Sequence, residues 1–481
     1  MILRPYQDRL MDGARMALRR SRSILIQSPT GSGKTALTVA MMSRAASRGL
    51  SSFFCVHQKE LLKQTSQALW EQRLEHGMIA AGKRNSIMPC QVASVQTLVR
   101  RLDQYKEPAM IIIDEAHRAA AATYMKILEH YPNAKIIGLT ATPERTDGKG
   151  LGHLFQEIVE GPSIRELIDA GYLCDYDLFA PPTETNLDEI RNISESDTAQ
   201  LEQAIDKPSI TGDAVEHYIK HASGKRCVVM CVSVNHAKHV AAQYRTQGIP
   251  AEAIYGDMAD ADRDGCFSRF KKGETLILTN VQLLVEGVDI PSIEVIQWLR
   301  PTESLIIWMQ GNGRGFRIFD GKGNLIIFDH VGNWKRHGLP DDDREWTLEG
   351  RKSRASRGSE DEAAIGIQQC KECFGIFRSG VDTCPTCGAP VILLPPKELT
   401  IKEGQLEKIN LERERTNRRQ EQGRSSGMKE LVELGVRRGM KKPGEWAVFV
   451  LASRKNRKPT AEEFAEVREV LAEVQGVANG W

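Results

Sequence analysis

The sequence predicts an α/β protein with two separate parallel-sheet domains, followed by a small four-cysteine module and a C-terminal region rich in helix. Three observations lead to this prediction. Two blocks of the chain alternate short apolar runs with longer helical stretches, two Cys-x-x-Cys pairs follow the second block, and the final segment has helical periodicity. Alternating strands and helices form parallel sheets that helices cover on both faces.

The first block predicts the first domain, which we expect to span residues 1–165. Its apolar runs are typical of buried strands because they are short and are bounded by polar residues. We predict strands at residues 23–27, 52–56, 110–113 and 135–139. Residues 166–210 lose the alternation and contain Pro181, Pro182 and an acidic stretch, so we expect a connector there.

The second block predicts the second domain, which we expect at residues 211–338. We predict its strands at residues 227–232, 253–255, 276–278 and 324–328. A charged, serine-rich linker is expected at 339–365, because such a composition disfavours a packed core. The four-cysteine module follows at residues 366–392.

The C-terminal region, residues 393–481, is predicted to be basic and partly helical. Thr460 and Glu463 have the spacing of a capping box, which would begin an amphipathic helix. Upstream of this helix, four arginines lie between residues 413 and 419. Their spacing fits either a solvated helical face or an element that contacts DNA, and the sequence leaves both alternatives open.

The overall composition restricts the class of protein and its partners. At about 150 residues per domain, 481 residues correspond to about three domains. Hydrophobic residues make up 41% and charged residues 27%, which excludes a disordered or fibrous chain. Because 65 basic and 63 acidic residues leave a net charge of only +2, nucleic acid would have to be bound by local patches.

Several features predict a cytoplasmic protein. The sequence has no apolar run of about 18 residues, and its N-terminus has no signal-peptide core. Six of the ten cysteines are scattered and the other four form two close pairs. This distribution suits a disulfide framework poorly, so we expect a reducing compartment and one metal site.

An octet after the first predicted strand has the composition of a phosphate-binding loop. Its small residues let backbone N–H groups surround phosphates at the N-terminus of the following helix. Lys34 is expected to neutralise the β- and γ-phosphates of ATP, and the Thr35 hydroxyl to ligate Mg²⁺. Ser28 stands where the usual pattern has Gly or Ala. The loop consists of Ser28, Pro29, Thr30, Gly31, Ser32, Gly33, Lys34 and Thr35.

An acidic pair follows the predicted strand at 110–113. Asp114 and Glu115 would lie at the carboxyl end of that strand, where open parallel sheets bind ligands. We expect Asp114 to hold Mg²⁺ and Glu115 to orient or deprotonate the attacking water. In the second block, Arg314 and Arg317 are spaced to lie on one helical face, and a guanidinium there could stabilise charge on a phosphoryl group across a cleft.

The order of these motifs resembles superfamily 2 helicases of the DEAD/DEAH-box type over about residues 1–335. This resemblance implies two RecA-like P-loop domains with ATP between them. Residues 28–35 resemble motif I, residues 114–117 spell the DEAH box, and residues 310–317 resemble motif VI. It also implies that Arg314 and Arg317 are arginine fingers, that Gln310 senses the γ-phosphate, and that Gly311 replaces an arginine found in many relatives.

The resemblance assigns further roles. Near the N-terminus, Gln7 would read adenine, and Arg4 belongs to the same nucleotide-binding element. The residues that would couple the ATP site to strand separation are His117, Thr140 and Thr142. Motif V would add Glu286, Gly287 and Asp289 to the nucleotide site. The loops that would contact the nucleic-acid backbone contain His57, Gln58, Lys59, Ser94, Gln96 and Thr97.

Two Cys-x-x-Cys turns can supply four thiolates to a tetrahedral Zn²⁺. The predicted ligands are Cys370, Cys373, Cys384 and Cys387. Four protein ligands leave no open position, so we expect a structural site whose metal supplies the folding energy of a very short module. Phe374 and Phe377 lie between the pairs, and they either pack around the metal or stack on bases.

Taken together, the motifs predict an ATP-dependent DNA helicase or translocase with ATP, Mg²⁺ and Zn²⁺ as ligands. The expected partner is single-stranded or forked DNA, and we also consider a single-strand-binding, repair or replication protein. Residues 299–304 and the zinc-type tail most resemble bacterial RadD-like and prophage-encoded DNA helicases, which implies a bacterial or phage-infected cell. An RNA helicase and an ATP-gated clamp without unwinding activity remain alternatives, and we expect a monomer.

Overall fold

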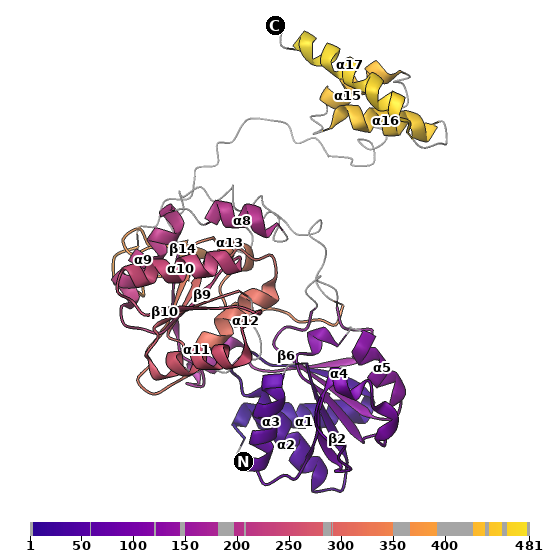
Figure 1. Cartoon of the computed structure of the whole chain (residues 1–481), viewed down its shortest axis with the longest axis vertical. Helices are drawn as coiled ribbons and strands as arrows, with labels where there is room; N and C mark the ends of the chain where they lie inside the picture. Colours follow the sequence, from indigo (N-terminus) through magenta and orange to yellow (C-terminus); the bar gives the residue numbers. More distant parts are fainter. Residues whose placement is uncertain are drawn as a thin grey trace. The chain divides into compact units, whose positions relative to one another are not determined.

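The computed structural model describes residues 3–57, 59–119, 122–144, 150–180, 197–205, 208–281, 290, 292–349, 366–391, 427–437, 442–454 and 459–478. The chain forms two compact units, Met1–Leu393 and Leu394–Trp481. The first unit contains two sheets, each packed against helices (Figure 1). No helix in these described segments is both long and apolar enough to cross a membrane.

The first sheet is entirely parallel, with the strand order β3-β4-β2-β5-β6-β1-β7. Its strands are β1 (Ser23–Gln27), β2 (Ser52–Val56), β3 (Gly77–Ile79), β4 (Cys90–Ser94), β5 (Met110–Ile113), β6 (Lys135–Thr140) and β7 (Glu157–Glu160). The surrounding helices are α1 (Pro5–Arg20), α2 (Lys34–Ala46), α3 (Lys59–Glu71), α4 (Val95–Leu98), α5 (Ala122–His130) and α6 (Ile164–Asp169), with 3₁₀ turns at Leu102–Gln104 and Ala116–Arg118.

The central strands of this sheet are buried on both faces, whereas the edge strand β7 is partly exposed. Ile24 and Ile26 pack into one hydrophobic cluster, whereas Leu25 between them packs into another on the opposite face. This alternation follows from the two-residue period of a strand. The four strands predicted from apolar runs are present as β1, β2, β5 and β6, which confirms the parallel α/β prediction for this block.

The second sheet has the order β10-β11-β9-β12-β13-β8-β15-β14. Its first six strands pair in parallel: β8 (Tyr176–Phe179), β9 (Cys227–Met230), β10 (Ala251–Ile254), β11 (Ile277–Asn280), β12 (Val295–Trp298) and β13 (Leu325–Asp329). Its helices are α8 (Thr198–Ile205), α9 (Pro208–Ala222), α10 (Val234–Thr246), α11 (Asp260–Lys272), α12 (Leu305–Gly315) and α13 (Asn333–His337).

The four-cysteine module extends this second sheet. Its hairpin consists of β14 (Ile367–Gln369) and β15 (Gly375–Arg378), and β15 pairs antiparallel with β8. The antiparallel pairing makes the sheet mixed. The hairpin also covers the edge of β8, whose backbone groups the parallel strands would leave unpaired. Strand β8 itself lies within the stretch 166–210 that the sequence predicts as a connector.

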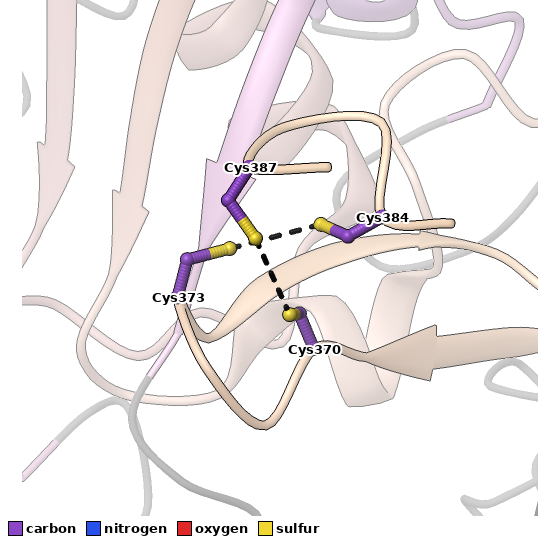
Figure 2. Close-up of side chains that lie close together, drawn as sticks. All are labelled: Cys370, Cys373, Cys384 and Cys387. Carbon is purple, nitrogen blue, oxygen red and sulfur yellow. Dashed lines mark hydrogen bonds between the residues drawn. The ribbon is translucent and has the colours of Figure 1, made fainter. Parts of the chain in front are cut away.

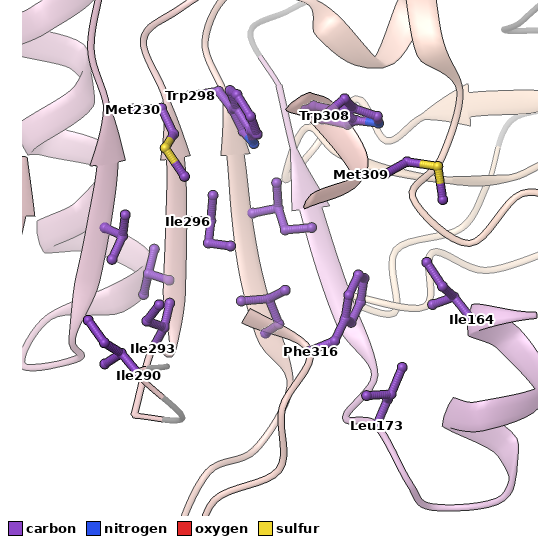
Figure 3. Close-up of a cluster of buried hydrophobic side chains, with 14 of the residues drawn as sticks. Ile164, Leu173, Met230, Ile290, Ile293, Ile296, Trp298, Trp308, Met309 and Phe316 are labelled. Carbon is purple, nitrogen blue, oxygen red and sulfur yellow. The ribbon is translucent and has the colours of Figure 1, made fainter. Parts of the chain in front are cut away.

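The core of the second sheet continues toward α6. Trp298 on β12 packs against Trp308 on α12, with ring centroids 5.2 Å apart. Figure 3 shows Phe316, at the end of α12, near Leu173, which follows α6 in the chain. One hydrophobic cluster thus contains residues of both sheets and fixes α12 beside the first domain.

The second unit is a bundle of α15 (Met428–Arg437), α16 (Pro443–Arg454) and α17 (Ala461–Ala478). It has its own core around Leu431, Val448 and Val467. The predicted capping box is present, because Thr460 N donates to Glu463 Oε2 (3.0 Å) and Glu463 N donates to Thr460 Oγ1 (3.4 Å). The arginines between residues 413 and 419 lie outside the described residues.

Candidate nucleotide site

The phosphate loop connects β1 to α2. Gly31 (φ 86°) and Gly33 (φ 77°) adopt left-handed conformations that bend the chain into the first turn of α2. Ser28, the departure from the usual pattern, is buried, and its hydroxyl lies 2.7 Å from the hydroxyl of Ser32. Ser32 Oγ in turn donates to Pro29 O at 2.7 Å. The serine therefore fits the loop because it has a hydrogen-bond partner within it.

Lys34 lies inside this loop. Its Nζ donates to Ser28 O (3.1 Å) and Pro29 O (3.2 Å). Burial lowers the pKa of Lys34, and the charges of Glu115 and Asp114 oppose this shift. A phosphate group would offer the buried ammonium a stronger acceptor than the two carbonyls.

The acidic pair follows β5 at the carboxyl end of the first sheet. Asp114 N donates to Cys55 O at 3.1 Å, and Glu115 adopts a left-handed conformation (φ 47°). Burial and then the charge of Glu115 raise the pKa of Asp114 to about 6, against the attraction of Lys34. A divalent cation between the two carboxylates would remove their mutual repulsion. The Thr35 hydroxyl could supply a further oxygen ligand to the same cation.

Helix α12 brings the second domain to these carboxylates. Gln310 Nε2 donates to Glu115 Oε2 across the domains at 3.3 Å. Gln310 is buried, and its Oε1 makes no hydrogen bond within the described residues. This acceptor fits a water molecule beside Glu115. Burial lowers the pKa of Arg317, because an enclosed guanidinium loses the hydration that favours its charged form.

Three glycines of α12 lie where a larger side chain would not fit, and one of them faces the first domain. An added Cβ on Gly311 would lie 2.6 Å from the ring of Trp298, which leaves no room there for the arginine that the family resemblance suggests at this position. On Gly313 it would lie 2.4 Å from Thr30 Cβ, and on Gly315 it would lie 2.5 Å from Leu325. Gly313 therefore packs directly onto the phosphate loop of the first domain.

Part of the phosphate loop, the acidic pair and two arginines of the second domain line one cavity of about 410 Å³, whereas Ser28, Gln310 and the glycines of α12 do not line it. Both domains contribute, and the predicted residues that it brings together include Lys34, Asp114, Glu115, Arg314 and Arg317. The complete lining is Arg4, Thr30, Gly31, Gly33, Lys34, Thr35, Ala36, Leu61, Asp114, Glu115, Tyr172, Arg314, Arg317 and Ile318. The sequence analysis missed Ala36, Leu61, Tyr172 and Ile318, which are isolated ordinary residues without a motif of their own.

The predicted coupling residues connect the acidic pair with the end of β6. His117 Nδ1 lies 3.4 Å from both Glu115 Oε2 and Thr140 Oγ1. Thr140 Oγ1 donates to Thr142 O (2.9 Å) and accepts from Thr142 N (3.1 Å). A continuous set of polar contacts thus connects Glu115 with the loop after β6. The motif V residues Glu286, Gly287 and Asp289 lie outside the described residues.

The predicted nucleic-acid residues lie at the carboxyl ends of β2 and β4. These strands pair with Val56 opposite Ser94, which places the two following loops side by side. Gln96 Nε2 lies 2.8 Å from His57 Nδ1, and Ser94 Oγ donates to Gln96 Oε1 at 2.9 Å. Thr97 lies in α4 and Lys59 begins α3, whereas Gln58 and the side chain of Lys59 lie outside the described residues.

The four cysteines converge on one point (Figure 2). Their sulfur atoms all lie within 4.8 Å of one another. The Sγ atoms of Cys370 and Cys387 are 3.7 Å apart, as are those of Cys373 and Cys384. Phe377 packs with Cys370 and Cys384 in a small core, which favours the packing alternative for this aromatic. Four converging sulfurs fit a tetrahedral Zn²⁺.

The sequence matches two known families. Residues 1–145 match the family described as type III restriction enzyme, res subunit, and residues 211–319 match the helicase conserved C-terminal domain. The chain is 29% identical over 447 residues to the "51.5 kDa protein" of a Lactococcus phage, covering 92% of this chain and 95% of the phage protein.

Two further comparisons agree with these families. The chain is 32% identical over 358 residues to the "Putative mitochondrial ATP-dependent helicase irc3" of Schizosaccharomyces pombe, covering 70% of this chain and 58% of the yeast protein. A solved fragment of a "putative HsdR subunit of a type I restriction enzyme" from Vibrio vulnificus YJ016 shares the fold, with 22% identity, a TM-score of 0.56 and coverage of 71% and 66%. Together with the order of the motifs, the two family matches and the helicase relative support superfamily 2 of the helicases as the family of this chain.

Proposed function

We propose that this chain hydrolyses ATP between its two RecA-like domains and uses the cycle to move along DNA or unwind it. The observation that carries the proposal is that Lys34, Asp114 and Glu115 share one cavity with Arg314 and Arg317 of the other domain. A triphosphate in this cavity would meet cations on both sides, so its hydrolysis would change the attraction between the domains.

Each side chain has a chemical role in this proposal. Lys34 would exchange its carbonyl partners for phosphate oxygens, and Asp114 with Thr35 would hold Mg²⁺, which polarises the γ-phosphoryl group. Glu115 would accept a proton from water, and the unpartnered Oε1 of Gln310 would help to orient that water. Arg314 and Arg317 would stabilise the charge that develops on the transferred phosphoryl group.

The contact between Gln310 and Glu115 supports coupling between hydrolysis and domain movement. The same carboxylate contacts His117, and His117 contacts Thr140. Loss of the γ-phosphate would therefore change partners on both sides of Glu115. Movement along a strand further requires two states that differ in their affinity for nucleic acid.

We propose that DNA lies across the carboxyl ends of β2 and β4, where His57, Ser94 and Gln96 cluster. His57 is exposed, and Ser94 and Gln96 are half-buried. Their imidazole, hydroxyl and amide groups suit contacts to the sugar–phosphate backbone, which position the strand without reading its sequence. The match of residues 1–145 to a restriction-enzyme family supports DNA as the substrate. We also propose that the four cysteines hold one structural Zn²⁺.

The test is ATP turnover with single-stranded DNA, duplex DNA, forked DNA and RNA, together with strand displacement on forked substrates. We expect DNA to stimulate turnover, and Lys34→Ala to remove most of it while Lys83→Ala, an exposed residue of the same domain, leaves it unchanged. Stimulation by RNA alone would indicate an RNA helicase, and stimulated turnover without displacement would indicate a clamp or duplex translocase. Absence of turnover with every ligand would overturn the proposal.

A further inference from the structure

Arg317 differs from Arg314 in what fixes its main chain. Helix α12 ends at Gly315, so Arg314 lies within its last turn, whereas Arg317 lies two residues beyond its end. The last carbonyl groups of a helix have no partner within it and need donors from elsewhere. The position of Arg317 therefore depends on the groups that bind the carbonyls of Gly315, Phe316 and Arg317 itself.

Lys322 supplies the donor to two of these three carbonyls. Its Nζ donates to Gly315 O and, at 3.0 Å, to Arg317 O. The lysine reaches back to the helix end because the chain turns tightly after α12. In this turn Lys322 N donates to Phe319 O at 3.0 Å, and Gly321 adopts a left-handed conformation (φ 81°). A charged donor forms a stronger hydrogen bond than a neutral one, and a cation at the C-terminus of a helix also stabilises the helix dipole.

The remaining carbonyl is bound by the segment that follows α6. Cys174 N donates to Phe316 O at 2.9 Å, and Cys174 Sγ donates to Gly315 O at 3.5 Å. The carbonyls of three consecutive residues are thus all bound by Lys322 or Cys174. Neither of these two residues belongs to the motif at residues 310–317.

The side chain of Arg317 extends from this bound main chain to the phosphate loop. An added Cβ on Gly31 would lie 3.6 Å from Arg317 Cγ, and Arg317 lines the nucleotide cavity together with Lys34. A small rotation of the main chain moves the end of a long side chain further than it moves the Cα atom. Misplacement of a reacting or stabilising group by about 1 Å can lower the rate of a reaction by about 100-fold.

We infer that Lys322 is a positioning residue for phosphoryl transfer, which holds the main chain of Arg317 so that the guanidinium meets the transferred phosphoryl group. This inference rests on the proposed function, because it assigns a further residue to the same reaction. Arg317 would act on the charge of the transition state, so loss of its position should lower kcat more than it weakens the binding of ATP. A lysine that only stabilised the end of α12 would lower the melting temperature without any dependence on Arg317.

The experiment is a double-mutant cycle of Lys322→Met and Arg317→Ala in the full chain. Its readouts are DNA-stimulated turnover, calorimetric affinity for a non-hydrolysable ATP analogue, and melting temperature. Met keeps the apolar stem of lysine and removes the ammonium group. We expect Lys322→Met to lower kcat by about 10- to 100-fold and to change the affinity for the analogue by less than about threefold. In the Arg317→Ala background it should lower kcat no further, because the group that Lys322 positions is absent.

Lys272→Met is the matched control. Lys272 also lies in the last turn of a helix of the second domain, α11, and it pairs with Glu274 at the exposed surface. This variant should have wild-type turnover. If Lys322→Met melts below the assay temperature, Lys322→Gln, which has a shorter and neutral side chain, takes its place in the cycle.

The outcomes separate the inference from the proposed function. Wild-type turnover of Lys322→Met or of Arg317→Ala would overturn the inference. An equal loss of kcat with and without Arg317 would also overturn it, because Lys322 would then be a general stabiliser of the domain, and this result would leave the proposed function intact. If the wild-type chain hydrolysed no ATP with any nucleic acid, the proposed function would fail, and the inference with it.

Discussion

Gly313→Ala tests whether the two domains must approach as closely as they do here. An ideal Cβ on Gly313 lies 2.4 Å from Thr30 Cβ, whereas carbon atoms in contact are normally about 3.5–4.0 Å apart. Thr30 Cβ is attached to the main chain and cannot be moved by a rotamer change. Helix α12 and the phosphate loop would therefore have to separate by roughly 1 Å or more.

The energetic cost falls on the interface between the domains. Overpacking of this kind costs about 1–3 kcal/mol, which would lower the population of the closed arrangement by about 5- to 150-fold. The second domain itself should not be weakened, because Ala favours a helix over Gly by about 0.8–1.0 kcal/mol. We therefore expect DNA-stimulated kcat/KM for ATP to fall at least fivefold while the melting temperature is unchanged or higher.

The matched control is Gly323→Ala in the same domain, where an added Cβ has no neighbour within 4 Å. Its turnover and melting temperature should equal those of the wild type. If Gly313→Ala hydrolysed ATP at the wild-type rate, close contact between Gly313 and Thr30 would not be part of the working cycle. A lower melting temperature for Gly313→Ala would instead place the damage inside the second domain.

Three other predictions follow from the structure. The pKa of Asp114, about 6, lies above its ordinary value of 3.8, so the ionised form destabilises the ligand-free protein. Stability should rise as the pH falls from 7 through 6 toward 4, and calorimetric melting should show a smaller rise for Asp114→Asn. Metal analysis should find about one zinc per chain, which Cys384→Ser removes together with part of the thermal stability, whereas Cys266→Ser, outside the cluster, retains the metal. Asp341→Ala should lower the free energy of unfolding by about 1–3 kcal/mol in urea titrations, because its fully buried carboxylate accepts from Arg165 Nε (2.7 Å) and Tyr176 Oη (2.5 Å); unchanged stability would contradict this role.

The sequence predicts those strands that are runs of apolar residues and those site residues that form contiguous motifs. Strands β1, β2, β5 and β6 consist largely of buried apolar residues, and their order with the helices implied a parallel sheet. The phosphate loop and the DEAH residues are contiguous, so their chemistry is visible without coordinates. Strands β4, β7 and β12 escaped prediction because buried or paired polar residues interrupt them, as Gln297 does in β12, where it accepts from Tyr244 Oη at 2.5 Å.

Properties that depend on long-range contacts could not be predicted. In a sequence, the glycines of residues 310–317 suggest a turn. In the structure they lie in helix α12, where Trp298 beside Gly311 and Thr30 beside Gly313 leave no space for a larger side chain. The glutamine of the N-terminal element suggested a base reader by resemblance. Only the coordinates reveal that its amide contacts the phosphate loop rather than the cavity.

Residues 163–180 connect the predicted functional parts of the first unit. Ser163 caps α6, Arg165 pairs with Asp341, and Tyr172 lines the nucleotide cavity. Cys174 N then donates to Phe316 O at 2.9 Å, directly beside Arg317. Strand β8 follows and pairs with both β13 and the cysteine hairpin. One continuous segment therefore contacts the cavity, the residue that follows α12 and the cysteine hairpin. A Zn²⁺ held by the four cysteines, as we propose, would therefore stabilise the edge of the sheet on which this segment ends.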